Sequence, residues 1–88
     1  MDLPVIIRQD GHAAAEGVAV DISQGGMFVR TETVLPFAES IILTIDLPGL
    51  GPTDLPAFVR WTTPEGFGVQ FGLLGARETH AINELTRR

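Results

Sequence analysis

The chain has 88 residues, of which 44% are hydrophobic, and it carries a net charge of −5. This length predicts a single domain over residues 1–88 with one modest core. All six basic residues are arginines scattered among eleven acids, so we expect no nucleic-acid binding, which needs a basic patch that neutralises phosphates. The absence of cysteine excludes disulfides and thiolate metal sites.

The apolar runs, such as residues 41–43, are far shorter than the ~20 residues of a membrane span. The N-terminus also lacks the basic region and the long apolar core of a signal peptide. We therefore expect a cytoplasmic protein that has no membrane span.

The first half of the chain contains three segments that alternate between apolar and polar residues, as β-strands do. They cover residues 4–9, 14–22 and 27–33. Asp10-Gly11, between the first two, is typical of a hairpin turn. Residues 21–26, Asp-Ile-Ser-Gln-Gly-Gly, form a compact polar corner between the second and third. Such a corner either closes a turn or presents donors and acceptors to a ligand.

Three further strands are predicted at residues 41–47, 55–62 and 67–71. Residues 48–52 between them hold two prolines and two glycines and predict a loop, and residues 63–66 predict a tight turn. Within the fifth strand, Pro56 is expected at the start or at an edge. Trp61 shares the inward row of Val59 and is expected in the core; the alternative is a position at a barrel mouth, where it would contact a partner.

The last part of the chain changes to a helical period. An apolar stripe at helical spacing is formed by Leu74, Ala81, Ile82 and Leu85. It predicts a helix of about three turns that packs on the open end of the strands. Together the elements predict a mainly β fold, a small six-stranded antiparallel β-barrel with one C-terminal α-helix, because closure removes exposed strand edges.

Two arginines are expected to be exposed on neighbouring strands, Arg30 and Arg60. They suit a phosphate or a partner carboxylate, whereas the more common outcome is pairing with a cross-strand acid such as Glu32 or Asp46, or simple exposure to solvent.

Phe28 and Phe58 lie opposite the inward rows. Either the assigned facing of these strands is wrong, or the helix covers both side chains, or they form an apolar patch on the surface. With Arg30 they are the expected interface for a protein partner. The helix is the other candidate surface.

The sequence contains no pattern that predicts a catalytic site or a metal site. His12 and His80 have no ligand-spaced acids around them, and Ser23 and Ser40 lie outside a Gly-x-Ser-x-Gly elbow. We therefore expect no metal, no cofactor and no enzymatic activity.

The chain resembles the PilZ domain family over nearly its whole length. Asp21, Ser23 and Gly26 match the Asp/Asn-x-Ser-x-x-Gly motif that this family carries between its second and third strands. Residues 57–61 resemble its Val-x-Trp strand, and residues 66–71 resemble its Gly-Val-x-Phe strand. The resemblance implies a six-stranded antiparallel barrel with a C-terminal helix.

Many members of that family bind the bacterial second messenger cyclic di-GMP through this motif and an Arg-x-x-x-Arg segment just before the first strand. In this sequence the residues before Pro4 are not basic, and Arg8 has no arginine four residues away. The candidate ligand-binding residues are Asp21, Ser23, Gly25, Gly26, Arg8, Arg30 and Arg60. The alternative is a purely structural corner, a turn in which the Asp21 and Ser23 side chains accept hydrogen bonds from backbone N–H groups and Gly25 or Gly26 takes a positive φ.

The expected function is that of a bacterial signalling module of the cyclic di-GMP pathway class that contacts another bacterial protein and binds the nucleotide weakly or not at all. The alternative is a cyclic di-GMP receptor that uses Asp21, Ser23 and Gly26, with arginines supplied from outside these residues. The family is associated with motility and biofilm control.

Overall fold

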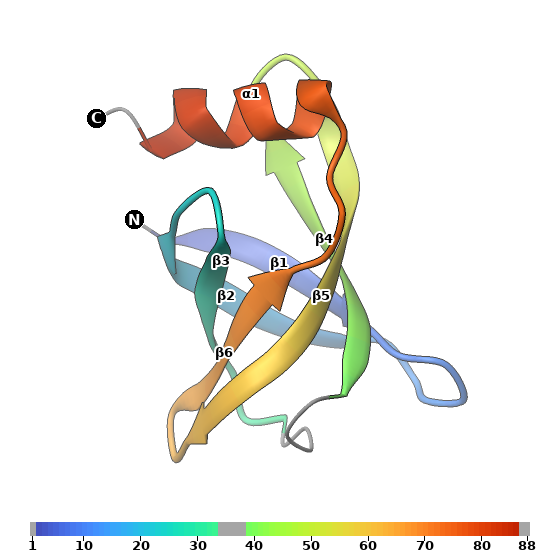
Figure 1. Cartoon of the computed structure of the whole chain (residues 1–88). Helices are drawn as coiled ribbons and strands as arrows, with labels where there is room; N and C mark the ends of the chain where they lie inside the picture. Colours follow the sequence, from blue (N-terminus) through green and yellow to red (C-terminus); the bar gives the residue numbers. More distant parts are fainter. Residues whose placement is uncertain (1, 34–38, 87–88) are drawn as a thin grey trace.

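A computed structural model describes residues 2–33 and 39–86 and shows a closed antiparallel barrel whose strand order is β1-β2-β3-β6-β5-β4 (Figure 1). Its elements are β1 (Leu3–Arg8), β2 (Ala15–Ile22), β3 (Gly26–Arg30), β4 (Ser40–Leu47), β5 (Gly51–Thr63), β6 (Gly66–Phe71) and α1 (Ala76–Thr86). The predicted fold class is therefore confirmed.

The largest difference from the predicted boundaries is at β5, which begins at Gly51 rather than at residue 55. Positive φ values at Gly49 (77°) and Gly51 (72°) reverse the chain sharply. The predicted loop over residues 48–52 is therefore shortened to a turn at residues 48–50, and β4 and β5 pair along a long hairpin.

The barrel interior is filled by the inward side chains of the strands. Leu43, Leu55 and Val59 have no exposed surface, and Phe67 is 1% exposed. Among the residues that the structure describes, no polar or charged residue is buried. Polar functional groups therefore lie on the outside of the barrel, or on the loops at its ends.

Pro56 lies inside β5, at a point where one side of the strand is a local edge. The Gly72 N–H donates to the Pro56 carbonyl (2.8 Å), while the Val59 N–H donates to the Glu39 carbonyl on the β4 side (3.0 Å). The backbone N–H and C=O groups of successive strand residues point to opposite sides of the strand. The backbone groups of Pro52 and Pro56 therefore both point away from β4. Strand β6 has already ended at Phe71, so no strand pairs with β5 on this side at Pro52 and Pro56. The absence of an N–H group in these prolines therefore breaks no hydrogen bond between strands.

Helix α1 lies across one open end of the barrel, as expected (Figure 1). Its start is capped by the Glu78 carboxylate, which accepts a hydrogen bond from the Gly75 N–H (2.8 Å). Ala81, Ile82 and Leu85 are buried and join the barrel core. Leu74 precedes the helix instead of lying on its stripe, although it still packs against the core.

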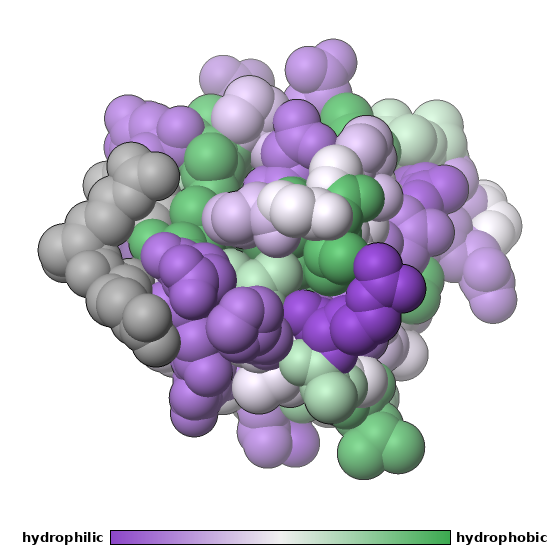
Figure 2. All heavy atoms as spheres, turned by 90° about the horizontal axis from the view of Figure 1, so that it is seen from above, coloured by the Kyte–Doolittle hydropathy of each residue, from purple (hydrophilic) through white to green (hydrophobic). Residues whose placement is uncertain are grey.

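The outer side of the α1 end shows mostly hydrophilic side chains with smaller hydrophobic areas between them (Figure 2). The helix has 11 residues. Within the described part of the chain, no helix has the length and apolar character that crossing a bilayer requires.

Candidate functional site

The predicted polar corner opens onto a pocket of about 390 Å³ on the outer face of β2, β3, β6 and β5. The lining residues are 21–23, 25–28, 60–61 and 69–70. The volume lies within the range of about 300–1,000 Å³ that small-molecule sites occupy. Barrel closure therefore places residues from two distant parts of the sequence around one hollow.

The backbone fixes the shape of the corner. The Ser23 N–H donates to the Gly26 carbonyl (2.9 Å), and the Gly25 carbonyl accepts from the Phe71 N–H (2.8 Å). The Ser23 hydroxyl lies 3.4 Å from the same Gly26 oxygen. Gln24, at the tip, donates to Asn83 on α1 (2.5 Å), which ties the corner to the helix.

The Asp21 side chain plays no part in holding this turn. It is exposed, and no described residue donates a hydrogen bond to its carboxylate. The positive-φ glycines are Gly11, Gly49 and Gly51. The interpretation of the corner as an Asp21-capped turn with a positive-φ glycine is therefore wrong, because backbone hydrogen bonds already close the turn.

Gly26 forms the floor of the pocket because β3 and β6 approach closely there. A Cβ atom at this position would lie 2.0 Å from the Val69 carbonyl oxygen. By contrast, a Cβ atom at Gly25 would have no atom within 4 Å. The last glycine of the motif is thus required by strand packing, while Gly25 is free of that constraint.

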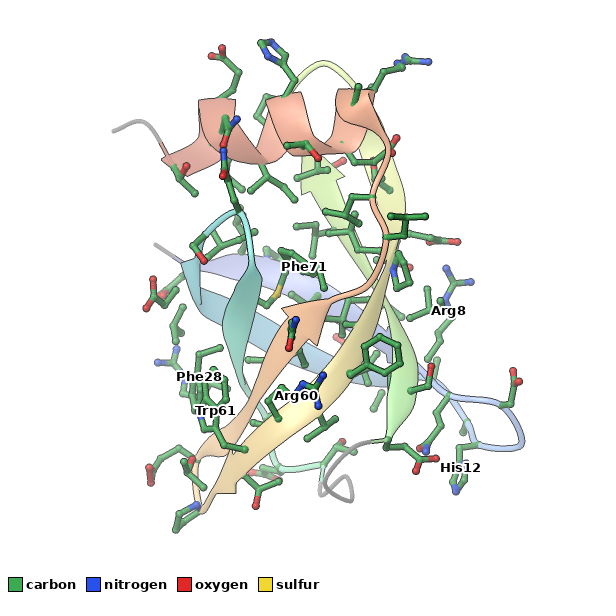
Figure 3. The ribbon with its side chains drawn as sticks, in the orientation of Figure 1. Arg8, His12, Phe28, Arg60, Trp61 and Phe71 are labelled. Carbon is green, nitrogen blue, oxygen red and sulfur yellow. The ribbon has the colours of Figure 1, made fainter. Side chains whose placement is uncertain are left out.

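Trp61 points outward, with 49% of its surface exposed, so its predicted place in the core is wrong. The pairing register between β5 and β6 shifts between Val59 and Trp61, and this bulge reverses the facing of the following residues. A Cβ atom at Gly68 would lie 1.9 Å from the Trp61 ring, so the indole lies against bare backbone. Phe28 pairs with Gly68 from the other side and lies beside Trp61 (Figure 3).

Arg60 occupies the bulge and lines the other end of the pocket. Its Nε donates to Gln70 Oε1 (2.9 Å), and its Cζ lies 5.9 Å from the centroid of the Phe58 ring. Phe58 faces outward and is 38% exposed, as its position in the alternation predicts. Arg60 therefore contacts the neutral amide of Gln70 and the aromatic ring of Phe58 instead of a cross-strand acid.

Arg8 belongs to a different face of the barrel (Figure 3). Its Nη2 donates to Asp54 (2.5 Å) and to Thr44 (2.6 Å), and Thr44 also donates to Asp54 (2.7 Å). The Thr44 hydrogen bond, opposed by slight desolvation and assisted by Arg8, lowers the pKa of Asp54 below its ordinary value. Arg8 lines a separate hollow of about 430 Å³ beside the β1–β2 turn.

Arg30 also lies away from Arg60, because β6 separates β3 from β5. The expectation that the two arginines lie on neighbouring strands is therefore wrong. Arg30 faces Asp2, with 4.0 Å between Nη2 and Oδ2, instead of the expected Glu32 or Asp46.

Neither histidine lines the corner pocket. His12 lies in the β1–β2 turn, with Nδ1 3.1 Å from the Asp10 carbonyl, and His80 lies on α1, 3.7 Å from Glu84. In the described part of the chain, no group of three or more His, Cys, Asp or Glu side chains is placed to bind a metal.

Gln70 is the site residue that the sequence analysis missed. Its outward position follows from the inward row of Phe67, Val69 and Phe71, and that alternation was the available signal. Its contact with Arg60 depends on the β5 bulge, which sequence alternation does not reveal.

Comparisons with known proteins agree with this architecture. A family model described as the PilZ domain matches residues 1–88. The crystal structure of the PilZ domain of CeSA from a cellulose-synthesizing bacterium has the same fold, with a TM-score of 0.78 at 20% identity over 99% of this chain and 91% of that chain. No curated protein sequence matches. The chain belongs to the PilZ domain family, a family of cyclic di-GMP signalling domains.

Proposed function

We propose that this PilZ domain acts in the bacterial cytoplasm through contacts with another protein, and that residues 1–88 alone bind cyclic di-GMP weakly. PilZ domains are binding and adaptor domains rather than enzymes. The observation that carries the proposal is the arginine content of the corner pocket. Among the described residues, only Arg60 contributes a guanidinium there. Arg8 and Arg30 lie elsewhere, next to Asp54 and Asp2.

The affinity that a pair of clamping arginines supplies is large. A hydrogen bond to a charged group contributes about 1.5–3 kcal/mol, so two arginines contribute roughly 3–6 kcal/mol. At about 1.4 kcal/mol per tenfold change, this corresponds to about two to four orders of magnitude in Kd. A micromolar site without its clamp therefore binds only at about 0.1–10 mM.

The surface proposed for protein contact is the outer face around β5 and β6. Phe58 and Trp61 are exposed there by 38% and 49%. Exposed aromatic side chains of this size are frequent anchors of protein interfaces. The set expected from sequence, Phe28, Arg30 and Phe58, lies on β3 and β5 and stays a prediction. If Arg30→Glu leaves every partner bound, Arg30 does not belong to it.

A second candidate function is a cyclic di-GMP receptor whose arginines come from a preceding segment or from another subunit. The exposed Asp21 carboxylate favours it, since it lines the pocket without a described partner. A carboxylate in that position accepts hydrogen bonds from the N–H groups of a guanine edge. The Ser23 hydroxyl and the glycine floor at Gly26 would lie against the same ligand.

Calorimetric titration with cyclic di-GMP separates the two functions. We expect a Kd above about 10 µM for residues 1–88. The matched protein carries an Arg-x-x-x-Arg segment fused before Met1, with an Ala-x-x-x-Ala fusion as its control. Low-micromolar binding by the arginine fusion alone supports the receptor. Weak binding by all three proteins supports protein contact, and a Kd below about 10 µM for residues 1–88 overturns the first proposal.

A further inference from the structure

Arg60 and Gln70 form a polar pair in the corner pocket that lies outside the Asp/Asn-x-Ser-x-x-Gly motif. The β5 bulge places Arg60 on the outer surface, and Gln70 reaches it from β6. The hydrogen bond to Gln70 uses Nε, and the Phe58 ring lies 5.9 Å from Cζ. The two Nη groups have no hydrogen-bond or ion-pair partner among the residues that the structure describes.

Gln70 holds the guanidinium without cancelling its charge. Asp21 lines the same pocket, yet no Asp21–Arg60 ion pair within 4.0 Å is formed, so the positive charge of Arg60 stays available. A planar guanidinium with two free Nη groups matches a phosphate bidentately. Because Gln70 and Phe58 already restrict the side chain, little further rotamer freedom is lost when an anion binds.

We propose that Arg60, positioned by Gln70, binds a phosphate group of a guanine nucleotide at this end of the corner pocket. The inference deepens the proposed function and rests on it in one respect, because the pocket must accept cyclic di-GMP at least weakly. Ser23 and Asp21 lie at the motif end of the pocket and Arg60 at the β5 end. The nucleotide therefore spans from β2 to β5.

The test is a titration of ¹⁵N-labelled protein, residues 1–88, with cyclic di-GMP, followed by NMR at the Ser23 and Gly26 amides and the Trp61 indole. Saturable shifts are expected at about 0.1–10 mM ligand. Arg60→Ala should weaken binding by about 10-fold or more, which corresponds to losing one charged hydrogen bond. Gln70→Glu, which is isosteric, should weaken it similarly, because the new carboxylate neutralises Arg60.

Two matched controls separate this role from general charge effects. Arg30→Ala removes an exposed arginine outside the pocket, and Ala13→Glu adds one negative charge in the β1–β2 connection; both should bind within about twofold of the unmodified chain. Unchanged affinity in Arg60→Ala and Gln70→Glu overturns the inference while leaving weak binding intact. The absence of saturable shifts in the unmodified chain overturns it as well.

Inorganic phosphate is the second probe. If phosphate alone produces the same shifts at the same concentrations, the site is a general anion site, and the nucleotide assignment is overturned. Stronger shifts with cyclic di-GMP, which depend on Arg60, support it. A Kd below about 10 µM overturns the weak-binding proposal, yet the Arg60 comparison still reports on this inference.

Discussion

Individual residues set the spacing between strands around the corner pocket, and Gly26 has no room for a side chain. Gly26→Ala would place Cβ 2.0 Å from the Val69 carbonyl oxygen, so β3 and β6 must separate. We expect the free energy of unfolding to fall by about 1–3 kcal/mol, as overpacking does. Urea unfolding measures this change, with Gly25→Ala as the control, which should stay within about 0.5 kcal/mol of the unmodified chain. Equal stability of the two variants would contradict this account of Gly26.

Asp54 gives the chain a small pH-dependent stability. Its pKa is lowered mainly by the Thr44 hydrogen bond and also by Arg8, so the folded state favours the ionised carboxylate. The resulting stabilisation is present above the ordinary pKa of aspartate and is lost as the pH falls through the lowered pKa. Asp54 is largely exposed, which keeps the effect modest.

Asp54→Asn should therefore be slightly less stable than the unmodified chain at pH 7, and the two should converge in strong acid. Thermal unfolding from pH 7 to pH 2 measures this convergence. Thr44→Ala removes the largest cause of the pKa shift of Asp54 and should reduce the pH-dependent part of the stability. A stability difference that stays constant down to pH 2 would exclude this role for Asp54.

At the scale of elements, alternation predicted strand faces well until the pairing became irregular. Leu55, Ala57 and Val59 are buried as the alternation requires. Trp61 then breaks the pattern because the bulge adds Arg60 as an unpaired residue. The position of that bulge depends on β6, where Gly68 leaves room for the indole, and a single strand's sequence does not contain this information.

Helix α1 contributes to the core of the barrel instead of lying on its surface as an independent element. Ile82 has no exposed surface and belongs to the core cluster. Ile82→Ala should reduce the free energy of unfolding by about 2–5 kcal/mol, as measured by urea unfolding. His80→Ala, on the exposed side of the same helix, should change it by less than about 0.5 kcal/mol. If Ile82→Ala melts the helix without lowering the midpoint of barrel unfolding, the two do not share a core.

At the scale of the whole molecule, the fold was predictable while half of the pocket was not. Strand number, barrel closure and the position of the corner follow from apolar periodicity and turn residues. The presence of Asp21 and Arg60 in the same pocket follows only from the strand order, in which β6 lies between β3 and β5. The same order separates Arg30 from Arg60, which sequence reasoning placed on adjacent strands.

Pro52 and Pro56, whose backbone groups point away from β4, also affect where β6 ends and the chain turns toward α1. Strand β6 ends at Phe71. The next residue, Gly72, donates its N–H to the Pro56 carbonyl, but Pro56 has no N–H group to donate in return. The segment from residue 72 to residue 75 then runs beside β5 without forming a ladder and delivers α1 to the barrel end (Figure 1). The missing amide protons of Pro52 and Pro56 therefore disfavour further pairing of β6 along β5, and the chain that remains forms α1, which covers one end of the barrel.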